Sequence, residues 1–224
     1  MSADESERTS RPGKTPEVPK LTDDEVALRE AENGLRQFDR LVALIEGAVA
    51  PGAPAFRLRP STLTELNRIA VEGLLVAPGS FRHGPIGITN SLHHPPPPED
   101  VPAEIDGMCD YVHDHWDASP VHLSSYVMWR LNWIHPFNDG NGRTSRAASY
   151  LVLCARLGLR LPGTGTIPER IAADKQPYYL ALDAADAAWR DGRVDVSSME
   201  HLVSAFLAAQ LVELHQLATG TKAP

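Results

Sequence analysis

Residues 135–146 read His-Pro-Phe-Asn-Asp-Gly-Asn-Gly-Arg-Thr-Ser-Arg, a stretch unlike the rest of the 224-residue chain. Pro136 disfavours helical geometry at the residue before it, so a helix must end near His135. The two glycines permit backbone conformations that other residues avoid, which indicates a tight loop. A second helix then follows from about Arg143 to Leu157. The stretch therefore predicts two helices joined by a short glycine-rich loop.

The rest of the chain is patterned mainly as helices. Ser119 followed by Pro120 is a strong start signal for the helix that leads into the loop. Capping boxes at Thr22–Glu25, Thr62–Glu65 and Ser197–Glu200 predict three further helix starts. The expected helices cover approximately residues 22–47, 62–75, 101–116, 119–135, 143–157, 168–173, 175–190 and the segment that begins at 197.

Credible strand material is confined to the segment between about Gly79 and Leu92. Ile86 and Ile88 alternate with other residues there, which predicts a short hairpin or an irregular flap. The predicted fold class is therefore all-α, a helical bundle with a short β-hairpin flap.

The chain divides into four expected parts. Residues 1–20 are polar, contain proline and show no periodicity, so we expect a disordered lead-in. Residues 21–59 form an N-terminal helical extension, and residues 60–217 form the main domain. Residues 218–224 are expected to be a C-terminal tail.

Composition and charge exclude several classes of protein. The formal net charge of -8 disfavours general binding to nucleic acid, which needs a basic face. No apolar run approaches the ~18 residues that a membrane span needs, and the N-terminus has no secretory h-region. Cys109 and Cys154 are too few and too far apart for a disulfide framework or a cysteine zinc site. We therefore expect a cytoplasmic protein that binds neither nucleic acid nor membrane.

The loop has the features of an anion site. Successive backbone N–H groups in a glycine-rich loop can form a concave nest for an anion. The loop then enters a helix N-terminus, where unpaired amides and the helix dipole favour phosphate. Arg143 and Arg146 lie three residues apart in the first turn, so both point to one side of that helix. Two cations at this unfavourable end of a helix indicate that an anion is bound beside them.

Asp139 and His135 add chemistry to this anion site. A carboxylate beside a phosphate cradle is unfavourable unless a cation lies between them, and Mg²⁺ is bound by one or two carboxylates together with substrate phosphates. An imidazole at the same place can take a proton from an attacking hydroxyl. Each residue alone is typical of an ordinary turn, but their combination within twelve residues predicts nucleotidyl or phosphoryl transfer with a metal.

Residues 135–146 fit, at every fixed position, the signature H-P-F-x-D/E-G-N-G-R-x-x-R of the Fic domain family, and the chain resembles that family. A coarser resemblance covers about residues 60–215, from the flap to the segment Pro177–Leu182. It implies a Fic-like helical bundle. It also implies a bacterial-type protein adenylyltransferase that transfers AMP from ATP to a Ser, Thr or Tyr hydroxyl of a target protein and releases pyrophosphate.

The resemblance also assigns roles to individual residues. His135 becomes the general base and Asp139 the ligand of Mg²⁺. Arg143 binds the β-phosphate and Arg146 the γ-phosphate of ATP. Phe137 is expected to anchor the loop in the core.

Further residues complete the implied nucleotide site. Gly140, Asn141 and Gly142 form the anion hole, with Asn141 touching the transferred phosphate. Asn138 is placed with the nucleotide-binding residues. Tyr179 reaches the adenine or packs between helices.

The flap is the expected docking surface for the target protein. By the same resemblance, Gly84, Ile86, Gly87 and Ile88 align the target chain through strand-like backbone contacts.

Other activities and regulators stay open. A Doc-like branch of the family phosphorylates, but it carries Ala and Lys where this chain has Gly140 and Gly142, which favours adenylylation. Transfer of another nucleotide such as UMP, removal of AMP from a modified protein and a non-enzymatic helical interaction domain are the alternatives. Glu46, followed by Gly47, is a candidate inhibitory residue that would restrain Arg146, and Glu32 is a second candidate. Relatives in this family often form homodimers, and the sequence does not decide this.

Overall fold

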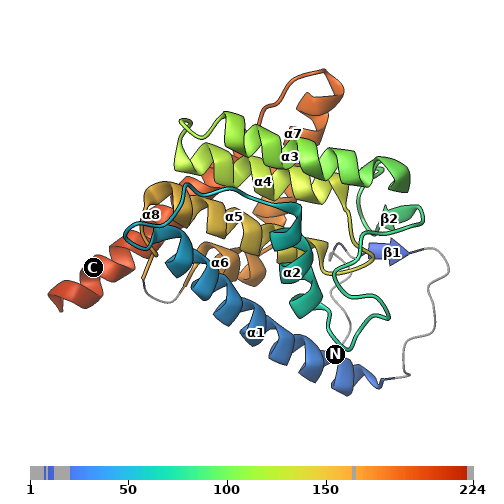
Figure 1. Cartoon of the computed structure of the whole chain (residues 1–224), viewed down its shortest axis with the longest axis horizontal. Helices are drawn as coiled ribbons and strands as arrows, with labels where there is room; N and C mark the ends of the chain where they lie inside the picture. Colours follow the sequence, from blue (N-terminus) through green and yellow to red (C-terminus); the bar gives the residue numbers. More distant parts are fainter. Residues whose placement is uncertain (1–7, 9, 13–20, 163–164, 221–224) are drawn as a thin grey trace.

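The computed structural model describes residues 8, 10–12, 21–162 and 165–220 (Figure 1). Eight α-helices, one 3₁₀ turn and two three-residue strands make up the regular structure of these residues. The predicted all-α class is confirmed. The disorder expected for residues 1–20 lies largely outside the described residues, as do positions 221–224 of the expected tail.

Two consecutive helices, α4 (Pro120–Ile134) and α5 (Asn141–Leu157), pack side by side through the centre of the bundle (Figure 1). Every residue from 123 to 131 in α4 is buried, as is every residue from 147 to 154 in α5. Small side chains let the helices approach closely, and the hydroxyl oxygens of Ser124 and Ser149 lie 2.7 Å apart. The packed helices α4 and α5 therefore hold the two ends of the predicted loop in place.

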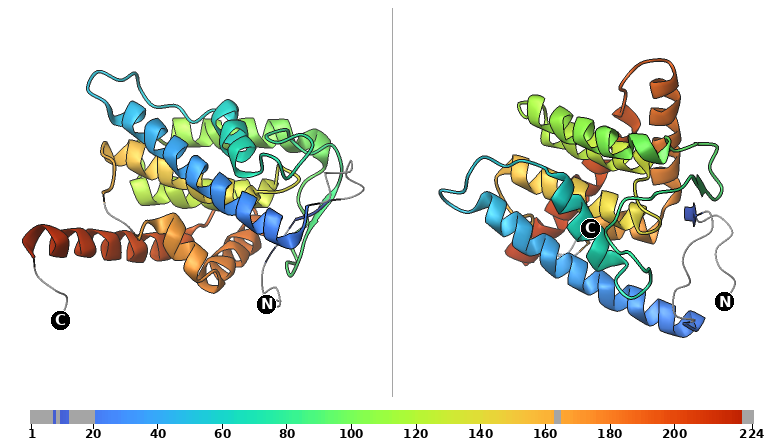
Figure 2. Two further views of the ribbon diagram at one scale, coloured as in Figure 1. Left: turned by 90° about the horizontal axis from the view of Figure 1, so that it is seen from below. Right: turned by 45° about the vertical axis from the view of Figure 1, so that its right-hand side comes forward.

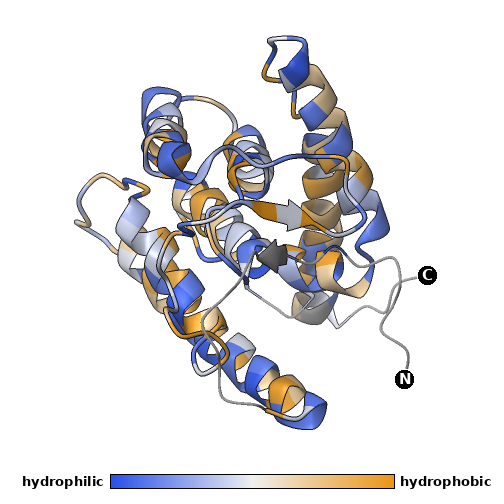
Figure 3. Ribbon diagram, turned by 90° about the vertical axis from the view of Figure 1, so that its right-hand side faces the viewer, coloured by the Kyte–Doolittle hydropathy of each residue, from blue (hydrophilic) through white to orange (hydrophobic). Residues whose placement is uncertain are grey.

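The N-terminal half covers one side of this pair. Helix α1 (Asp23–Val49) begins at the predicted capping box and crosses α2 (Pro60–Ala70) and α5 (Figures 1 and 2). Alternating hydrophilic and hydrophobic bands along α1 reflect one buried face, which repeats every fourth residue (Figure 3). The predicted N-cap of α2 at Thr62 is wrong by three residues, because Arg59 is the N-cap and Pro60 occupies the first helical position, where its fixed φ suits a helix. The same helix ends at Ala70, earlier than expected.

The remaining helices close the bundle. The 3₁₀ turn η1 (Pro98–Asp100) leads into α3 (Val101–Asp114), which packs against α4. Helices α6 (Ile167–Ala173), α7 (Gln176–Arg190) and α8 (Ser197–Thr219) cover another side of α4 and α5. The predicted cap at Ser197 is wrong by one position, because Ser197 is the first helical residue and its N–H bonds Asp195 Oδ1 at 3.1 Å. None of the helices described combines the length and the apolar character that a membrane crossing requires.

The flap is a strand with a distant partner. Strand β2 (Ile86–Ile88) pairs antiparallel with β1 (Ser10–Pro12), with Ser10 opposite Ile88 and Pro12 opposite Ile86 (Figure 1). The prediction of a local hairpin in the flap is therefore wrong, because the described pairing joins β2 to a segment more than 70 residues earlier in the chain. Three residues expected in the disordered lead-in belong to this two-stranded sheet.

Candidate active site

His135 ends helix α4 in a left-handed backbone conformation, with φ 49° and ψ 57°. Its carbonyl oxygen accepts a hydrogen bond from Arg82 Nε at 2.8 Å, and Arg82 Nη2 also donates to the carbonyl of Ile134 at 3.3 Å. The Arg82 side chain is itself almost completely buried and reaches the flap through the carbonyl of Gly84 at 3.2 Å. Arg82 therefore fixes the end of α4 and ties it to the flap. Sequence reasoning missed this role, because a lone arginine in a loop carries no local signal.

The imidazole of His135 is buried, with 6% of its residue surface exposed. Burial is the main cause that lowers its pKa from 6.5 to about 4, assisted by the charges of His93 and Arg82 and opposed by a hydrogen bond with the carbonyl of Asn132. His135 Nδ1 lies 3.3 Å from that carbonyl oxygen, which can only accept a hydrogen. Nδ1 therefore carries the proton and Nε2 is the basic nitrogen. The predicted general base is neutral at pH 7.

The loop after His135 is closed by its own side chains. Asn141 Oδ1 accepts from the Phe137 backbone N–H at 2.9 Å, and Asn141 Nδ2 donates to the Phe137 carbonyl at 2.8 Å. Phe137 is fully buried against Phe81, with ring centroids 5.6 Å apart, as expected for an anchor. Both ends of the Asn141 carboxamide thus hold the loop, and Asn141 lines the cavity in which it is predicted to contact a phosphate.

Gly140 is required by both conformation and space. Its φ is 76°, and an added Cβ would lie 2.7 Å from Val71 Cγ1 and 2.9 Å from Asn67 Nδ2. Its carbonyl oxygen accepts from the backbone N–H of Thr144 at 2.9 Å and from the Thr144 hydroxyl at 2.8 Å. The start of α5 is therefore packed tightly against α2.

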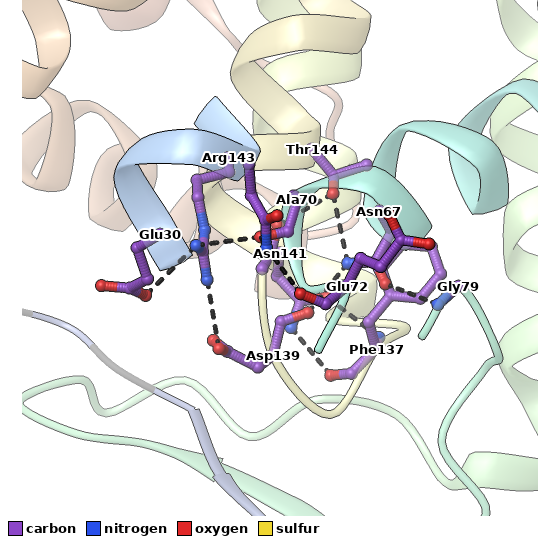
Figure 4. Close-up of polar contacts among 12 residues, drawn as sticks. Glu30, Asn67, Ala70, Glu72, Gly79, Phe137, Asp139, Asn141, Arg143 and Thr144 are labelled. Atoms are coloured by element: carbon purple, nitrogen blue, oxygen red, sulfur yellow. Dashed lines mark hydrogen bonds and ion pairs between the residues drawn. The ribbon is translucent and has the colours of Figure 1, made fainter. Parts of the chain in front are cut away.

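Asn67 of α2 joins the loop to the rest of the fold (Figure 4). Its Nδ2 donates to the Asp139 carbonyl at 2.8 Å and to Thr144 Oγ1 at 3.3 Å. Its Oδ1 accepts from the Gly79 N–H at 3.2 Å, and the residue is 1% exposed. Sequence reasoning missed Asn67, since its partners lie 12 to 77 residues away.

Arg143 is held by three groups (Figure 4). Its Nη1 lies 3.1 Å from Glu30 Oε1 on α1 and donates to the carbonyl of Ala70 at 3.2 Å. Its Nη2 donates to Asp139 Oδ2 at 3.1 Å. The guanidinium thus bridges two carboxylates at the predicted phosphate site.

A cavity of about 300 Å³ opens beside the loop. It brings together most residues that were predicted to bind nucleotide or metal, and the flap contributes Ile88. The predicted residues that line it are His135, Asp139, Gly140, Asn141, Gly142, Arg143, Arg146, Tyr179 and Ile88. The predicted residues outside its lining are Asn138, Gly84, Ile86, Gly87 and Glu46.

Arg146 and Gly142 share one wall of this cavity. A Cβ on Gly142 would lie 3.2 Å from Arg146 Nη1. Glycine at this position therefore leaves room for the second guanidinium beside the N-terminus of α5.

The hypothesis that Glu46 restrains Arg146 is wrong. Glu46 Oε1 lies 2.7 Å from Arg160 Nη1 on the surface. It follows Glu30 by sixteen residues on α1, a distance of about 24 Å along a helix that rises 1.5 Å per residue. The glutamate of α1 at the cavity is Glu30, which no sequence pattern indicated.

The second inhibitory candidate, Glu32, pairs with a residue of its own helix and not with Arg143 or Arg146. Glu32 Oε2 is 3.6 Å from Arg29 Nη1, with both side chains half exposed. The neighbouring Asn33 is buried and donates to the carbonyls of Ala70 and Glu72 at 3.3 and 2.9 Å. Asn33 therefore fastens α1 to the end of α2.

The rest of the cavity lining comes from outside the loop. It includes Tyr179, which was predicted at the site, and Arg8, His93 and Asp186, which were not. Tyr179 is buried, and its ring lies under the guanidinium of Arg8 at 4.7 Å from the ring centroid. His93 Nε2 lies 2.7 Å from the carbonyl oxygen of Trp133, and its Nδ1 lies 3.8 Å from Asp186 Oδ2. We call Arg8, His93, Tyr179 and Asp186 the aromatic wall of the cavity, and Arg143 and Arg146 of α5 its cationic wall.

Asp139 is the candidate metal ligand. The described residues contain no group of three or more His, Cys, Asp or Glu side chains that could hold a metal without a substrate. The Asp139 side chain is 44% exposed and lines the cavity beside the two arginines. One accessible carboxylate fits Mg²⁺, which takes its remaining oxygen ligands from phosphates and water.

Comparisons with known proteins find related sequences and structures. Residues 57–153 match the model of a family described as the Fic/DOC family. A protein named protein adenylyltransferase Fic from Nematostella vectensis is 31% identical over 111 residues, 48% of this chain and 24% of that protein. A protein of the same name from Drosophila willistoni is 36% identical over 70 residues, 30% of this chain and 14% of that protein. The chain thus spans a quarter or less of the length of these two relatives.

Solved structures show the same fold. The crystal structure of a Fic domain containing signaling protein from Bacteroides thetaiotaomicron superposes with a TM-score of 0.67 and 23% identity. The superposition covers 88% of this chain and 76% of that one. The shared architecture therefore extends well beyond the twelve-residue loop.

Proposed function

We propose that the protein is an adenylyltransferase that moves AMP from ATP to a hydroxyl of a target protein, on the premise that residues 57–153 match the Fic/DOC family. Relatives named protein adenylyltransferase Fic support the proposal. The observation that carries it is the convergence of His135, Asp139, Arg143 and Arg146 on one cavity at the N-terminus of α5.

His135 acts as the base in this proposal. The hydroxyl oxygen of the target attacks the α-phosphorus, and the bond from this phosphorus to the bridging oxygen of the β-phosphate breaks. The hydroxyl proton passes to His135 Nε2, and pyrophosphate leaves. The low pKa of the buried ring keeps it unprotonated at neutral pH, and the Asn132 carbonyl holds it in the required tautomer.

The cationic wall positions the nucleotide. Arg143 and Arg146 hold the β- and γ-phosphates, while the amides at the start of α5 face the phosphate that is transferred. Asp139 holds Mg²⁺, which neutralises phosphate charge when it is bound. Positioning and charge stabilisation of this kind supply most of the rate enhancement in such transfers.

The test uses ATP labelled at either phosphate. We expect α-labelled ATP with Mg²⁺ to label protein in a cell lysate when the enzyme is added, and γ-labelled ATP to give no labelling beyond that of the same lysate without the enzyme. The His135→Ala and His135→Asn variants should lose about 10²- to 10⁴-fold in rate, since a general base contributes that much. Both should still be stabilised against heat by Mg²⁺ and ATP, because binding stabilises the folded state. Undiminished labelling by these variants would refute the assignment.

The same assay separates the other activities. Label from the γ-phosphate would indicate phosphorylation, and label from α-labelled UTP would indicate uridylyl transfer. Release of AMP from protein that has already been labelled would indicate the reverse reaction. Mass spectrometry of the labelled protein then identifies the target.

A further inference from the structure

We propose that strand β1 occupies the docking edge of the flap, with Arg8 anchored beside it on α7, in place of a target protein. A target displaces them with an extended segment of its own. That segment carries a basic residue two positions before the strand that pairs with the flap. This inference rests on the proposed function for its biological meaning. The docking itself rests on contacts within the chain.

The first observation is the pairing of β1 with β2. The flap strand Ile86–Ile88 presents a backbone edge, and Ser10–Pro12 add to that edge as an antiparallel strand. Addition of a strand to an exposed edge is a general mode of peptide recognition, in which the backbone supplies affinity and the side chains supply specificity. Ile88, which pairs with Ser10, also lines the cavity that contains His135. The strand therefore lies beside the reacting centre.

The second observation is the anchoring of Arg8 on α7. Arg8 Nη2 lies 2.7 Å from Asp183 Oδ2, and the guanidinium stands 4.7 Å from the ring centroid of Tyr179. The Arg8 backbone N–H donates to the Tyr179 hydroxyl at 3.2 Å. The Arg8 side chain is only 13% exposed and lines the cavity. An aromatic ring and a carboxylate thus form a subsite for a cationic side chain.

Both contacts are of a displaceable kind. A two-stranded sheet of three-residue strands is marginal in isolation. The carboxylate of Asp183 is half exposed, so its ion pair with Arg8 is screened by solvent. Ser10–Pro12 fill the edge in the antiparallel direction, and Arg8 fills the cationic subsite two residues before that strand begins. A target that reaches the same cavity along β2 must match that spacing.

The experiment uses the full chain and measures docking without relying on catalysis. Backbone hydrogen exchange of residues 86–88 is compared between the wild type and Arg8→Ala. We expect exchange about 5- to 10-fold faster in the variant, because one ion pair and one cation–π contact are lost. Arg193→Ala is the matched control, since Arg193 makes exposed pairs with Asp191 and Asp195 elsewhere. It should leave the exchange unchanged.

A peptide then tests whether the edge is a docking site. A synthetic peptide with the sequence of residues 6–14 should bind Arg8→Ala and restore slow exchange at residues 86–88. The same peptide with Arg8→Glu should fail. The Arg8→Glu peptide should bind a protein that carries both Asp183→Arg and Arg8→Ala, because the positive and negative charges of the Arg8–Asp183 pair are then exchanged between peptide and protein.

Labelling of lysate proteins from α-labelled ATP completes the test. Arg8→Ala should label its target faster than the wild type at low target concentration, because an internal competitor is weakened. Equal exchange in Arg8→Ala and the wild type, or equal binding of the two peptides, would overturn the docking surface. Faster exchange with unchanged labelling of the target would overturn the competition. If no variant transfers label, the proposed function fails, while the peptide arm still decides the docking surface.

Discussion

The two walls of the cavity are built in different ways. The cationic wall belongs to the loop 135–146, in which several side-chain bonds join residues three or four apart, as between Phe137 and Asn141 or Gly142 and Ser145. The aromatic wall depends on pairs that are distant in sequence, such as the pair of Arg8 with Asp183, which holds Arg8 in place across a separation of 175 residues. The turn of the first wall is therefore encoded locally, although contacts such as that of Asn67 fix it to the fold, whereas the second wall exists only after the chain has folded.

Substitution of Gly140 by alanine should cause the largest effect. Alanine adopts φ 76° with strain, and its Cβ would lie 2.7 Å from Val71 Cγ1. Left-handed strain and overpacking together should lower the free energy of unfolding by about 3 kcal/mol and abolish most transfer. Chemical denaturation and the labelling assay measure the two losses.

Gly158 provides a matched control at the other end of α5. Its φ is 72°, but an added Cβ would meet nothing within 4 Å. Gly158→Ala should therefore cost only about 1 kcal/mol, the strain of the backbone alone. Equal losses at the two glycines would show that the contact with α2 does not constrain the loop.

Asn67→Ala should have the next largest effect. The change removes donors to the Asp139 carbonyl and Thr144 and leaves the Gly79 N–H without its acceptor, which should cost about 2 kcal/mol. Transfer should also fall, because the loop loses its link to α2. Gln210→Ala is the control, since Gln210 is a buried amide that bonds Tyr150 and Pro162 away from the loop. It should lower stability and leave transfer by folded protein unchanged.

These contrasts explain how much could be predicted from the sequence. The loop, both flanking helices and the predicted residues from His135 to Arg146 that line the cavity were accessible, because turn chemistry and a twelve-residue signature are local. Asn67 and Arg82 were not, since their partners are up to 77 residues away and only the tertiary fold brings them together. The roles of such residues could not be predicted from any pattern within a single segment.

The flap and the inhibitory glutamate show the same limit. Alternation at Ile86 and Ile88 indicated a strand, but the pairing partner of a strand is not contained in its own sequence. Glu46 satisfied part of a short pattern, yet its position on α1 places it beside Arg160. Glu30 faces Arg143 because of the angle at which α1 crosses α5, which is a property of packing.

His135 lines the same cavity as both walls, and its titration reports on the burial of the ring. Burial lowers its pKa from 6.5 to about 4, so kcat/KM should stay flat from pH 7 to about 5 and fall below about pH 4 as the base becomes protonated. Between pH 4 and pH 6.5, the folded ring binds fewer protons than the ring of the unfolded chain. The stability contributed by the neutral buried ring is therefore present above pH 6.5 and is lost as pH falls toward 4. NMR titration of the imidazole measures the pKa directly.

Removal of the Arg8 side chain from the aromatic wall gives a further test of the pKa of His135. Because Arg8 lines the cavity that contains His135, Arg8→Ala should admit water to the ring and raise its pKa toward 6.5, and the acid limb of the rate profile should move with it. An ordinary pKa in the wild type would show that the ring is hydrated in solution.

Glu30→Gln should have the smallest effect. The carboxylate of Glu30 competes with phosphate for Arg143, so its neutralisation should strengthen binding of ATP with Mg²⁺. Glu30 is about half exposed, and ion pairs of this kind contribute about 0.2–1 kcal/mol. The dissociation constant, measured by calorimetry, should therefore fall by no more than about 5-fold.

Glu46→Gln is the matched control for this last change. It removes the same charge from the same helix, but its partner Arg160 lies outside the cavity, so the affinity for ATP should not change. Because the competition is electrostatic, the difference between Glu30→Gln and the wild type should shrink as salt screens exposed charges. A gain that is equal in both variants would reflect net charge alone, and a gain that persists at 1 M salt would contradict direct competition for Arg143.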